Sequence, residues 1–453
     1  MRLLRSEEAQ AEVRRLAARG AVDLARVEAP VAGIVNAVRR RGDRALRQYA
    51  QQFDGLSSGQ PLRVPAEEIA AAWDAVTPEF RKALKQSAAN IRRFCQWQKP
   101  KSWMRTAQPG LRVGQLVQPL GAVGCYVPGG RYPLPSTVLM TAVPAQVAGV
   151  KRIAVVSPRP VAQTLAAAAL LGIDEVYRIG GAQAIAALAY GTATVARVDK
   201  IVGPGNLFVT AAKKMVAWDC AIDFLAGPTE VVLVSHDGNP TFLASDLVAQ
   251  AEHDPDASAV FVTCSRRLAA AVVRETERLS ADNPIARQSL AQNGAVLVAA
   301  SRKQAMDFAN TLASEHLTVS RNDLKAVRNA GAVFVGDYSP QAMGDYASGP
   351  NHVLPTAAVA RHRGGLSVLD YLKIISVQES TRSGLVKLAP AITTLADAEG
   401  LRAHGDSVRL RVSNPARATR AVVSANPARG SKNSQPARGN WNARASRAGV
   451  GNA

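Results

Sequence analysis

Two residues that can bind a metal stand three positions apart in the chain, Gln250 and His253. We expect them on a helix over residues 240–253, with Asn239 as its N-cap and Pro240 at the first helical position. At this spacing an amide oxygen and an imidazole share one face of a helix, and both can bind a divalent metal. Spacing alone favours an ordinary surface helix, so a metal site depends on residues elsewhere.

A carboxylate and an imidazole stand next to each other at Glu315 and His316, at the entry to an expected strand. Adjacent side chains point in different directions, so we expect separate roles rather than a dyad. Histidine titrates near neutral pH and suits proton abstraction, whereas a glutamate can activate a water molecule. A polar turn without chemistry is an equally good interpretation of the pair by itself.

Two later segments carry side chains that could complete a site. Residues 344–356 form an expected long loop, in which Asp345 could supply an oxygen ligand to a metal. His352 competes for that role, or belongs to a structural turn. Glu399 and His404 are five positions apart, so on a straight helix they would lie about 140° apart. A solvated helix end explains that spacing better than a shared site does.

Three glycine-rich turns each follow an expected strand. They are Val127-Pro-Gly-Gly-Arg, Ile179-Gly-Gly-Ala-Gln-Ala and Val202-Gly-Pro-Gly-Asn. In parallel sheets ligands bind at the carboxyl ends of strands, where glycine lets backbone N–H groups approach a phosphate. None of the turns is a GxGxxG fingerprint or a P-loop, so each alone is a weak signal. Together they predict a nucleotide site.

Short β-branched segments alternate with alanine-rich helices from residue 116 onward. The first set has strands near 116–127, 152–157, 175–179 and 200–202, with helices near 136–148, 160–171, 182–189 and 206–215. The second set has strands near 230–235, 258–263, 295–299, 318–320 and 332–335, with helices at 240–253 and 265–279. This alternation predicts parallel βαβ units and two doubly wound α/β domains. Residues 6–98 and 366–412 have helical patterns.

The composition fits a large globular protein. The chain has 453 residues, of which 47% are hydrophobic and 5% aromatic, enough for about two or three domains. No apolar run reaches the ~18 residues that span a bilayer, and the charged start lacks a signal-peptide pattern. Four scattered cysteines without a CxxC motif predict reduced thiols in a cytoplasmic protein.

The net charge of +20 is concentrated partly in the last forty-one residues, 413–453. This tail carries seven basic and no acidic residues, and its Ala, Asn, Ser, Gly and Pro content predicts disorder. No helix-turn-helix, zinc-finger or RNA-binding motif accompanies the charge. We therefore expect no specific nucleic-acid partner, although a salt-sensitive affinity for polyanions is compatible with the charge.

Eight of these segments, in order over residues 10–412, resemble signatures of the histidinol dehydrogenase family. They are Gly124-Cys-Tyr-Val-Pro-Gly-Gly, Gly180-Gly-Ala-Gln-Ala-Ile-Ala-Ala-Leu, Gly203-Pro-Gly-Asn, Ala226-Gly-Pro-Thr-Glu-Val, Ala249-Gln-Ala-Glu-His-Asp-Pro, Ser314-Glu-His-Leu, Gly344-Asp-Tyr-Ala-Ser-Gly-Pro-Asn-His-Val-Leu-Pro-Thr and Ala398-Glu-Gly-Leu-Arg-Ala-His. The resemblance implies an oxidoreductase that uses NAD and Zn²⁺. It would oxidise L-histidinol through L-histidinal to L-histidine, the last steps of histidine biosynthesis.

The resemblance also implies a role for each candidate residue. One Zn²⁺ would be bound by Gln250, His253, Asp345 and His404. L-histidinol would be contacted by Thr229, Gln250, His253, His316, Asp345, Glu399 and His404. NAD would be contacted by Tyr126, Gln183 and Asn206. His316 would be the base, and Glu315 would activate water for the second oxidation.

The implied architecture is two Rossmann-like domains of the aldehyde-dehydrogenase-like kind, with a small helical C-terminal domain. The expected parts are a helical arm at 1–24, a metal and catalytic domain at 25–120 with 232–365, an NAD-binding domain at 121–231, a dimer-exchanged helical domain at 366–412 and the tail at 413–453. Glu399 and His404 would reach into the partner subunit, so a homodimer would share its active sites.

Three other functions compete with this interpretation. A zinc-dependent hydrolase also uses metal, Glu and His, but it does not explain the glycine turns. A dehydrogenase of another amino alcohol and a basic binding protein without activity are the others. Two departures from the family pattern are the basic segment 360–365 and Thr229, where some members have Ser.

Overall fold

The computed structural model describes residues 1–18, 24–129 and 133–413. Its contacts divide the chain into two compact units. The first unit combines Met1–Ser102 with Gln115–Ile375, and the second combines Trp103–Gly114 with the chain from Ser376. Nearly all of the expected disordered tail, and Gly130 and Arg131 of the first glycine turn, lie outside the described residues.

The first unit contains a five-stranded parallel sheet with the order β6-β5-β4-β7-β8. Its strands are β4 (Ala122–Tyr126), β5 (Arg152–Val156), β6 (Val176–Tyr177), β7 (Lys200–Val202) and β8 (Ala221–Ile222). The chain winds from β4 outward to β6, then crosses back to β7 on the other side. This confirms a doubly wound sheet, with its topological switch between β4 and β7.

Four helices of this segment cover the two faces of the sheet. They are α6 (Pro135–Ala148), α7 (Ala162–Leu170), α8 (Gly181–Tyr190) and α9 (Leu207–Val216). In β4, Val123 and Cys125 pack into the core with α6 and α7, whereas Ala122 and Tyr126 pack into the core with α8 and α9. Alternate residues of a strand face opposite sides, so a strand covered on both faces is apolar throughout.

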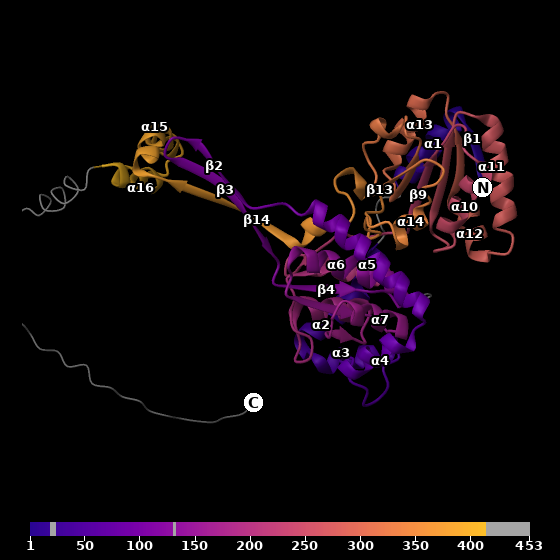
Figure 1. Cartoon of the computed structure of the whole chain (residues 1–453), viewed down its shortest axis with the longest axis horizontal. Helices are drawn as coiled ribbons and strands as arrows, with labels where there is room; N and C mark the ends of the chain where they lie inside the picture. Colours follow the sequence, from indigo (N-terminus) through magenta and orange to yellow (C-terminus); the bar gives the residue numbers. More distant parts are fainter. Residues whose placement is uncertain (19–23, 130–132, 414–453) are drawn as a thin grey trace, which may run out of the picture. The chain divides into compact units, whose positions relative to one another are not determined.

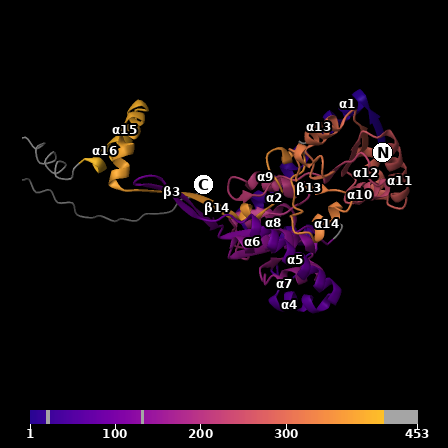
Figure 2. The same ribbon diagram turned by 45° about the horizontal axis from the view of Figure 1, so that its top comes forward.

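The N-terminal helices pack on the same sheet. They are α2 (Ala25–Arg41), α3 (Asp43–Phe53), α4 (Ala66–Ala75) and α5 (Pro78–Gln98). α2 and α3 join the core around α8, while α4 and α5 join the core around α6 and α7. α4 and α7 lie side by side in Figure 1 and in Figure 2. The sequence-based division groups these helices with residues 232–365; they share cores with β4–β8, and α5 also bonds the backbone of Tyr346 and Ala347.

A second parallel sheet has six strands in the order β1-β11-β10-β9-β12-β13. The strands are β1 (Arg2–Arg5), β9 (Glu230–Val234), β10 (Ser258–Thr263), β11 (Gly294–Val298), β12 (His316–Val319) and β13 (Ala332–Val335). One face is covered by α10 (Pro240–Ala251), α11 (Arg266–Leu279) and α12 (Pro284–Asn293), and the other by α1 (Ser6–Ala17) and α13 (Arg302–Leu312) (Figure 1). This sheet is doubly wound as well, with its switch between β9 and β12.

Three expectations about local structure in the first unit are corrected. Residues 1–24 do not form a purely helical arm, because Arg2–Arg5 is β1 and pairs with β11. α10 ends at Ala251, so His253 lies in a bend beyond the helix rather than on it. Asp345 is not in a loop, because Gln341–Tyr346 forms the short helix α14.

The second unit contains a strand ladder and two helices. The order β14-β3-β2 joins β2 (Trp103–Gln108), β3 (Leu111–Pro119) and β14 (Leu372–Ser380). α15 (Arg382–Ala398) and α16 (Arg402–Val412) pack against each other. The expectation that residues 366–412 are all helical is therefore wrong at β14. No helix among the described residues has both the length and the hydropathy to cross a membrane.

Candidate active site

Glu315 and His316 lie at the amino end of the second sheet. Both are buried, with 7% and 4% of their surface exposed. Glu315 Oε2 accepts hydrogen bonds from Thr229 Oγ1 at 2.5 Å and from the Glu230 amide at 3.0 Å. Parallel pairing of β12 with β9 sets His316 beside Val231, which places the starts of these two strands together. Residues 86 positions apart thus form one polar cluster.

The two neighbouring side chains approach each other but are not hydrogen-bonded. Glu315 Oε2 and His316 Nδ1 are 3.7 Å apart, so the side chains do not diverge as expected from their adjacent positions. His316 Nδ1 instead bonds the Glu230 carbonyl oxygen at 3.2 Å. A carbonyl only accepts, so Nδ1 carries the proton and Nε2 is the basic atom of the neutral ring.

His316 Nε2 is available for proton transfer. It is buried, and within the described chain it has no hydrogen-bond partner. Asp345 Oδ1 is 3.6 Å away, and both residues line a cavity of 520 Å³. Burial lowers the pKa of His316, but the Glu315 and Asp345 carboxylates outweigh it and raise the pKa to about 9. The site therefore stabilises an imidazolium strongly.

Gln250 connects the expected metal ligands to this cluster. It is 1% exposed, and its Nε2 donates to Thr229 Oγ1, which in turn donates to Glu315. This orientation leaves the amide oxygen of Gln250 without a hydrogen bond from the described residues. His253 follows the helix in a turn closed by its N–H and the Gln250 carbonyl at 3.4 Å. The exposed ring of His253 lines a second cavity, of 570 Å³.

Asp345 is surrounded by imidazoles. Burial raises the pKa of Asp345, but His316, His352 and His253 together lower it below its usual value. His352 is not free to act as a ligand here, because Nδ1 bonds the Asp345 carbonyl oxygen at 2.8 Å and Nε2 lies 3.3 Å from Thr137 Oγ1. Of the two alternatives left open by the sequence, the structural turn describes His352.

The first unit contains three of the four expected metal ligands, Gln250, His253 and Asp345, and His253 is near enough to Asp345 to lower its pKa. Within residues 1–18, 24–129 and 133–413, no three His, Cys, Asp or Glu side chains converge as a metal site. Glu399 and His404 belong to the second unit, where both are exposed. They do not share a helix, because Glu399 is the C-cap of α15 and His404 lies in α16. Gly400, with φ of +75°, separates the two helices.

Three backbone amides of the glycine turns in the first sheet bond to side chains of the protein. The Gly180 amide donates to Asp54 Oδ2 at 2.9 Å, and the Gly203 amide donates to Asp223 Oδ2 at 2.8 Å. The Gly181 amide donates to the Tyr126 hydroxyl at 3.1 Å. These three amides are therefore occupied within the protein, and the expected nucleotide site at the turns stays a prediction. No local pattern in the sequence predicts the roles of Asp54 and Asp223, which bond to these amides from other segments of the chain.

Close packing explains the glycine at these positions. A Cβ on Gly203 would lie 2.2 Å from the Tyr126 carbonyl oxygen, and its φ of +111° is in the region that favours glycine. A Cβ on Gly180 would lie 2.7 Å from the ring of Pro158. The turns at the carboxyl ends of the strands are thus packed tightly against one another.

The three expected NAD contacts line one cavity at these carboxyl ends. Tyr126, Gln183 and Asn206 surround a space of 360 Å³. The Tyr126 hydroxyl accepts from Gly181 and keeps its own proton to donate, since burial raises its pKa to about 12. Asn206 Oδ1 caps α9 by accepting from the Val209 amide, which leaves its NH₂ free. Asn206 also lines the 570 Å³ cavity with Thr229 and His253, so the two cavities meet at this residue.

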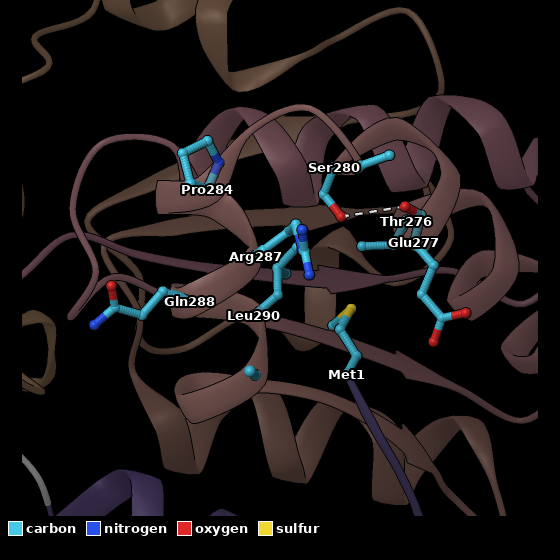
Figure 3. A pocket seen from close by; sticks show the side chains of 10 residues that line it. Met1, Thr276, Glu277, Ser280, Pro284, Arg287, Gln288 and Leu290 are labelled. Atoms are coloured by element: carbon cyan, nitrogen blue, oxygen red, sulfur yellow. Dashed lines mark hydrogen bonds between the residues drawn. The ribbon is translucent and has the colours of Figure 1, made fainter.

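A larger cavity lies away from this chemistry. It measures 680 Å³ and is lined by Met1 and by residues of α11, α12 and their connection (Figure 3). Glu277 and Arg287 are its charged residues, and none of the expected site residues lines it. Volume alone therefore does not identify the active site.

Two doubly wound sheets, a cavity at the switch point of one and a buried Glu–His pair beside the other fit an oxidoreductase. Comparison with known proteins agrees with this class. The family model described as histidinol dehydrogenase matches residues 17–412. The chain therefore belongs to the histidinol dehydrogenase family.

Individual relatives cover almost the whole described chain. A histidinol dehydrogenase of Methanothermobacter thermautotrophicus is 46% identical over 412 residues, which are 88% of this chain and 96% of the relative. One of Syntrophotalea carbinolica is 45% identical over 430 residues, covering 91% of this chain and 100% of the relative. The crystal structure of histidinol dehydrogenase from Elizabethkingia anophelis has a TM-score of 0.86 at 35% identity, covering 91% of this chain and 98% of that one.

Proposed function

We propose that this protein oxidises L-histidinol through L-histidinal to L-histidine and transfers two hydrides to two molecules of NAD. Membership of the family supports the substrate. The observation that carries the chemistry is His316 Nε2, a buried basic atom that has no hydrogen bond to the described residues and belongs to a residue lining a cavity with Asp345. A base in this setting can take the hydroxyl proton of an alcohol while hydride leaves the carbon that bears this hydroxyl.

The first oxidation uses the fixed tautomer of His316. Nε2 takes the hydroxyl proton of histidinol, and Nδ1 stays bonded to the Glu230 carbonyl. The imidazolium that forms is stabilised by Glu315 and Asp345. If Asp345 binds a cation, only Glu315 still stabilises the imidazolium of His316, and the pKa of His316 would fall toward the neutral range in which a base works.

The second oxidation needs a water molecule and a second base. Burial raises the pKa of Glu315, with opposing contributions from His316, Thr229 and the Glu230 amide. A carboxylate with a raised pKa is a stronger base, so Glu315 can deprotonate water as it adds to the aldehyde. The hydrate then transfers its hydride to a second NAD, and the product is the carboxylate. Glu315→Gln should slow histidinol oxidation more than it slows histidinal reduction; equal effects contradict this role.

The residues present in the first unit fit a Zn²⁺ site that takes a fourth ligand from elsewhere. The amide oxygen of Gln250 has no hydrogen bond from the described residues, the His253 ring is exposed, and the pKa of the Asp345 carboxyl is lowered; Zn²⁺ accepts all three as ligands. His404 of a second copy would be the fourth ligand. Bound there, Zn²⁺ would hold the imidazole and amino groups of histidinol, while proton transfer stays with His316 and Glu315.

Sharing of the site between two copies can be tested by mixing variants. His316→Asn and His404→Ala each inactivate one half of the site. In a homodimer that exchanges His404, half of the mixed dimers are heterodimers, and each has one intact site. The mixture should then recover about a quarter of wild-type turnover. If every site uses residues of one chain, the mixture stays inactive.

The main test is the formation of NADH from L-histidinol and NAD. Two NADH should form per histidinol, and His316→Asn should lose at least about a hundredfold in turnover. His362→Asn is a matched control, because His362 is exposed and lines no cavity described above. Wild-type turnover by His316→Asn contradicts the proposal. If no NADH forms, a zinc hydrolase is favoured instead. If another amino alcohol is turned over faster than L-histidinol, that amino alcohol replaces L-histidinol as the proposed substrate.

We also propose a cytoplasmic location, and the state of the thiols supports it. Cys95, Cys125, Cys220 and Cys264 are all free in the structure. Unpaired cysteines are typical of a reducing compartment, which supports a cytoplasmic enzyme.

A further inference from the structure

Asp54 is a buried carboxylate in the cofactor cavity that the reaction does not use. It follows α3 as its C-cap and is 5% exposed. Its Oδ2 accepts from the Gly180 amide at 2.9 Å and from Gln183 Nε2 at 3.0 Å. Its Oδ1 accepts no hydrogen bond from the described residues, and Asp54 lines the 360 Å³ cavity. One oxygen is anchored, and the other is available to a ligand.

The carboxylate occupies a place where phosphate binds in many nucleotide sites. The Gly180 amide is at the N-terminus of α8, and a helix N-terminus attracts anions. Asp54 already supplies the negative charge there. A phosphate at the same place would lose these donors and would lie against a carboxylate, so the cavity favours an uncharged part of the cofactor near Asp54.

The rest of the cavity fits an adenosine. Its apolar walls are the side chains of Ile34, Phe53, Pro128, Pro158 and Phe208. The polar side holds Asp54 with Tyr126, Gln183 and Asn206, which suit the hydroxyls of a ribose. The adjoining 570 Å³ cavity reaches Thr229, which donates to Glu315, so the other half of a dinucleotide can extend toward that pair.

Among the described residues, Arg159 is the one cation that lines the 360 Å³ cavity. Burial raises the pKa of Asp54, and the hydrogen bonds from Gly180 and Gln183 and the charge of Arg159 oppose that rise. The Arg159 side chain passes over Gly55, since a Cβ there would meet Arg159 Cδ at 3.4 Å. An arginine can bind a ribose 2′-phosphate, but the charge of this arginine is balanced by Asp54.

We propose that Asp54 is a specificity-determining residue, which accepts a hydrogen bond from a ribose hydroxyl and excludes a dinucleotide with a 2′-phosphate. An ionised carboxylate accepts but does not donate, so it binds a hydroxyl and repels a phosphate. This inference rests on the proposed function only in taking the 360 Å³ cavity as the adenosine site.

The test measures binding of NADH and NADPH by fluorescence in the absence of histidinol, so it does not depend on turnover. Asp54→Asn keeps the size of the side chain and removes the charge. It should reduce the NADH-over-NADPH preference by about tenfold or more, mainly by strengthening NADPH binding. The double variant, Asp54→Asn with Arg159→Gln, should lose this gain in NADPH binding, because the gain comes from the Arg159 guanidinium once Asp54 no longer balances its charge.

A second variant keeps the proposal testable if Asp54→Asn does not fold. Arg159 is exposed, so Arg159→Gln should fold. It leaves Asp54 unbalanced and should weaken NADPH binding more than NADH binding. An unchanged preference in both Asp54→Asn and Arg159→Gln, or stronger NADPH binding in Arg159→Gln, overturns the role of Asp54. Wild-type NADH binding without oxidation of histidinol contradicts the proposed function instead.

Discussion

Asp246 should destabilise the helix that carries Gln250. It lies one turn before Gln250 in α10 and is only partly buried. Burial raises its pKa from the ordinary 3.8 to about 6, and no ion pair to Asp246 is present in the described residues. Its backbone carbonyl accepts from Gln341 Nε2 at 2.7 Å, and this bond does not depend on the side-chain charge. Asp246→Asn therefore removes the charge and keeps the other contacts.

The pKa sets the size and sign of the effect. A rise from 3.8 to about 6 corresponds to ~3 kcal/mol. Because solvent reaches this side chain, we expect about half of this free energy, ~1–2 kcal/mol. A raised pKa means that the folded protein binds the proton more tightly than the unfolded chain does. The contribution of protonated Asp246 to the free energy of unfolding is therefore fully present below pH ~4 and is lost as the pH rises through ~6.

Urea unfolding at pH 8 and at pH 5 measures this prediction. Asp246→Asn should raise the free energy of unfolding by ~1–2 kcal/mol at pH 8 and by about half as much at pH 5. Asp282→Asn is the control for charge alone, because Asp282 is exposed. A gain that is equal at both pH values, or equal to that of Asp282→Asn, refutes the reasoning from burial.

Three further predictions concern a buried ion pair, a glycine turn and the metal. Lys213 and Asp223 form a buried ion pair at 2.5 Å, so Lys213→Met should cost about 3–5 kcal/mol in urea unfolding. Adding Asp223→Asn should reduce that loss; a larger loss contradicts the unpaired-charge explanation. Gly203→Ala should weaken NADH binding because its Cβ would meet the Tyr126 carbonyl, whereas Gly336→Ala, also at positive φ but in open space, should cost only about 1 kcal/mol of stability. Removing metal with a chelator should abolish turnover but keep NADH binding, and Zn²⁺ should restore turnover; loss of both indicates unfolding.

The order and type of most elements follow from local patterns in the sequence. β-branched segments alternate with alanine-rich helices, and this alternation was enough to predict two parallel, doubly wound sheets. Helix starts such as Asn239 with Pro240 were also predictable, because capping depends on neighbouring residues. The strand at Arg2–Arg5 was not, because a short edge strand is stable only when paired with β11.

The Gln250–His253 spacing illustrates the limit of local reasoning. The sequence predicted both residues on one helical face, but α10 ends at Ala251, and a turn places His253 beyond it. The residue types were correct candidates for a ligand set, whereas their geometry depended on where the helix ended. The motif signatures identified the family without that geometry, because they preserve residue types in order.

The sequence by itself determined the family, the doubly wound architecture and the residues able to do chemistry. Only the tertiary structure decided what each polar group contacts. Parallel pairing of β9 with β12 joined Thr229 to Glu315, and packing of α3 brought Asp54 to an amide 126 positions away. The fold also bonds Nδ1 of His316 to the Glu230 carbonyl and leaves Nε2 without a hydrogen bond in the described chain. The physical reason is that such contacts depend on side chains distant in sequence, which no local spacing encodes.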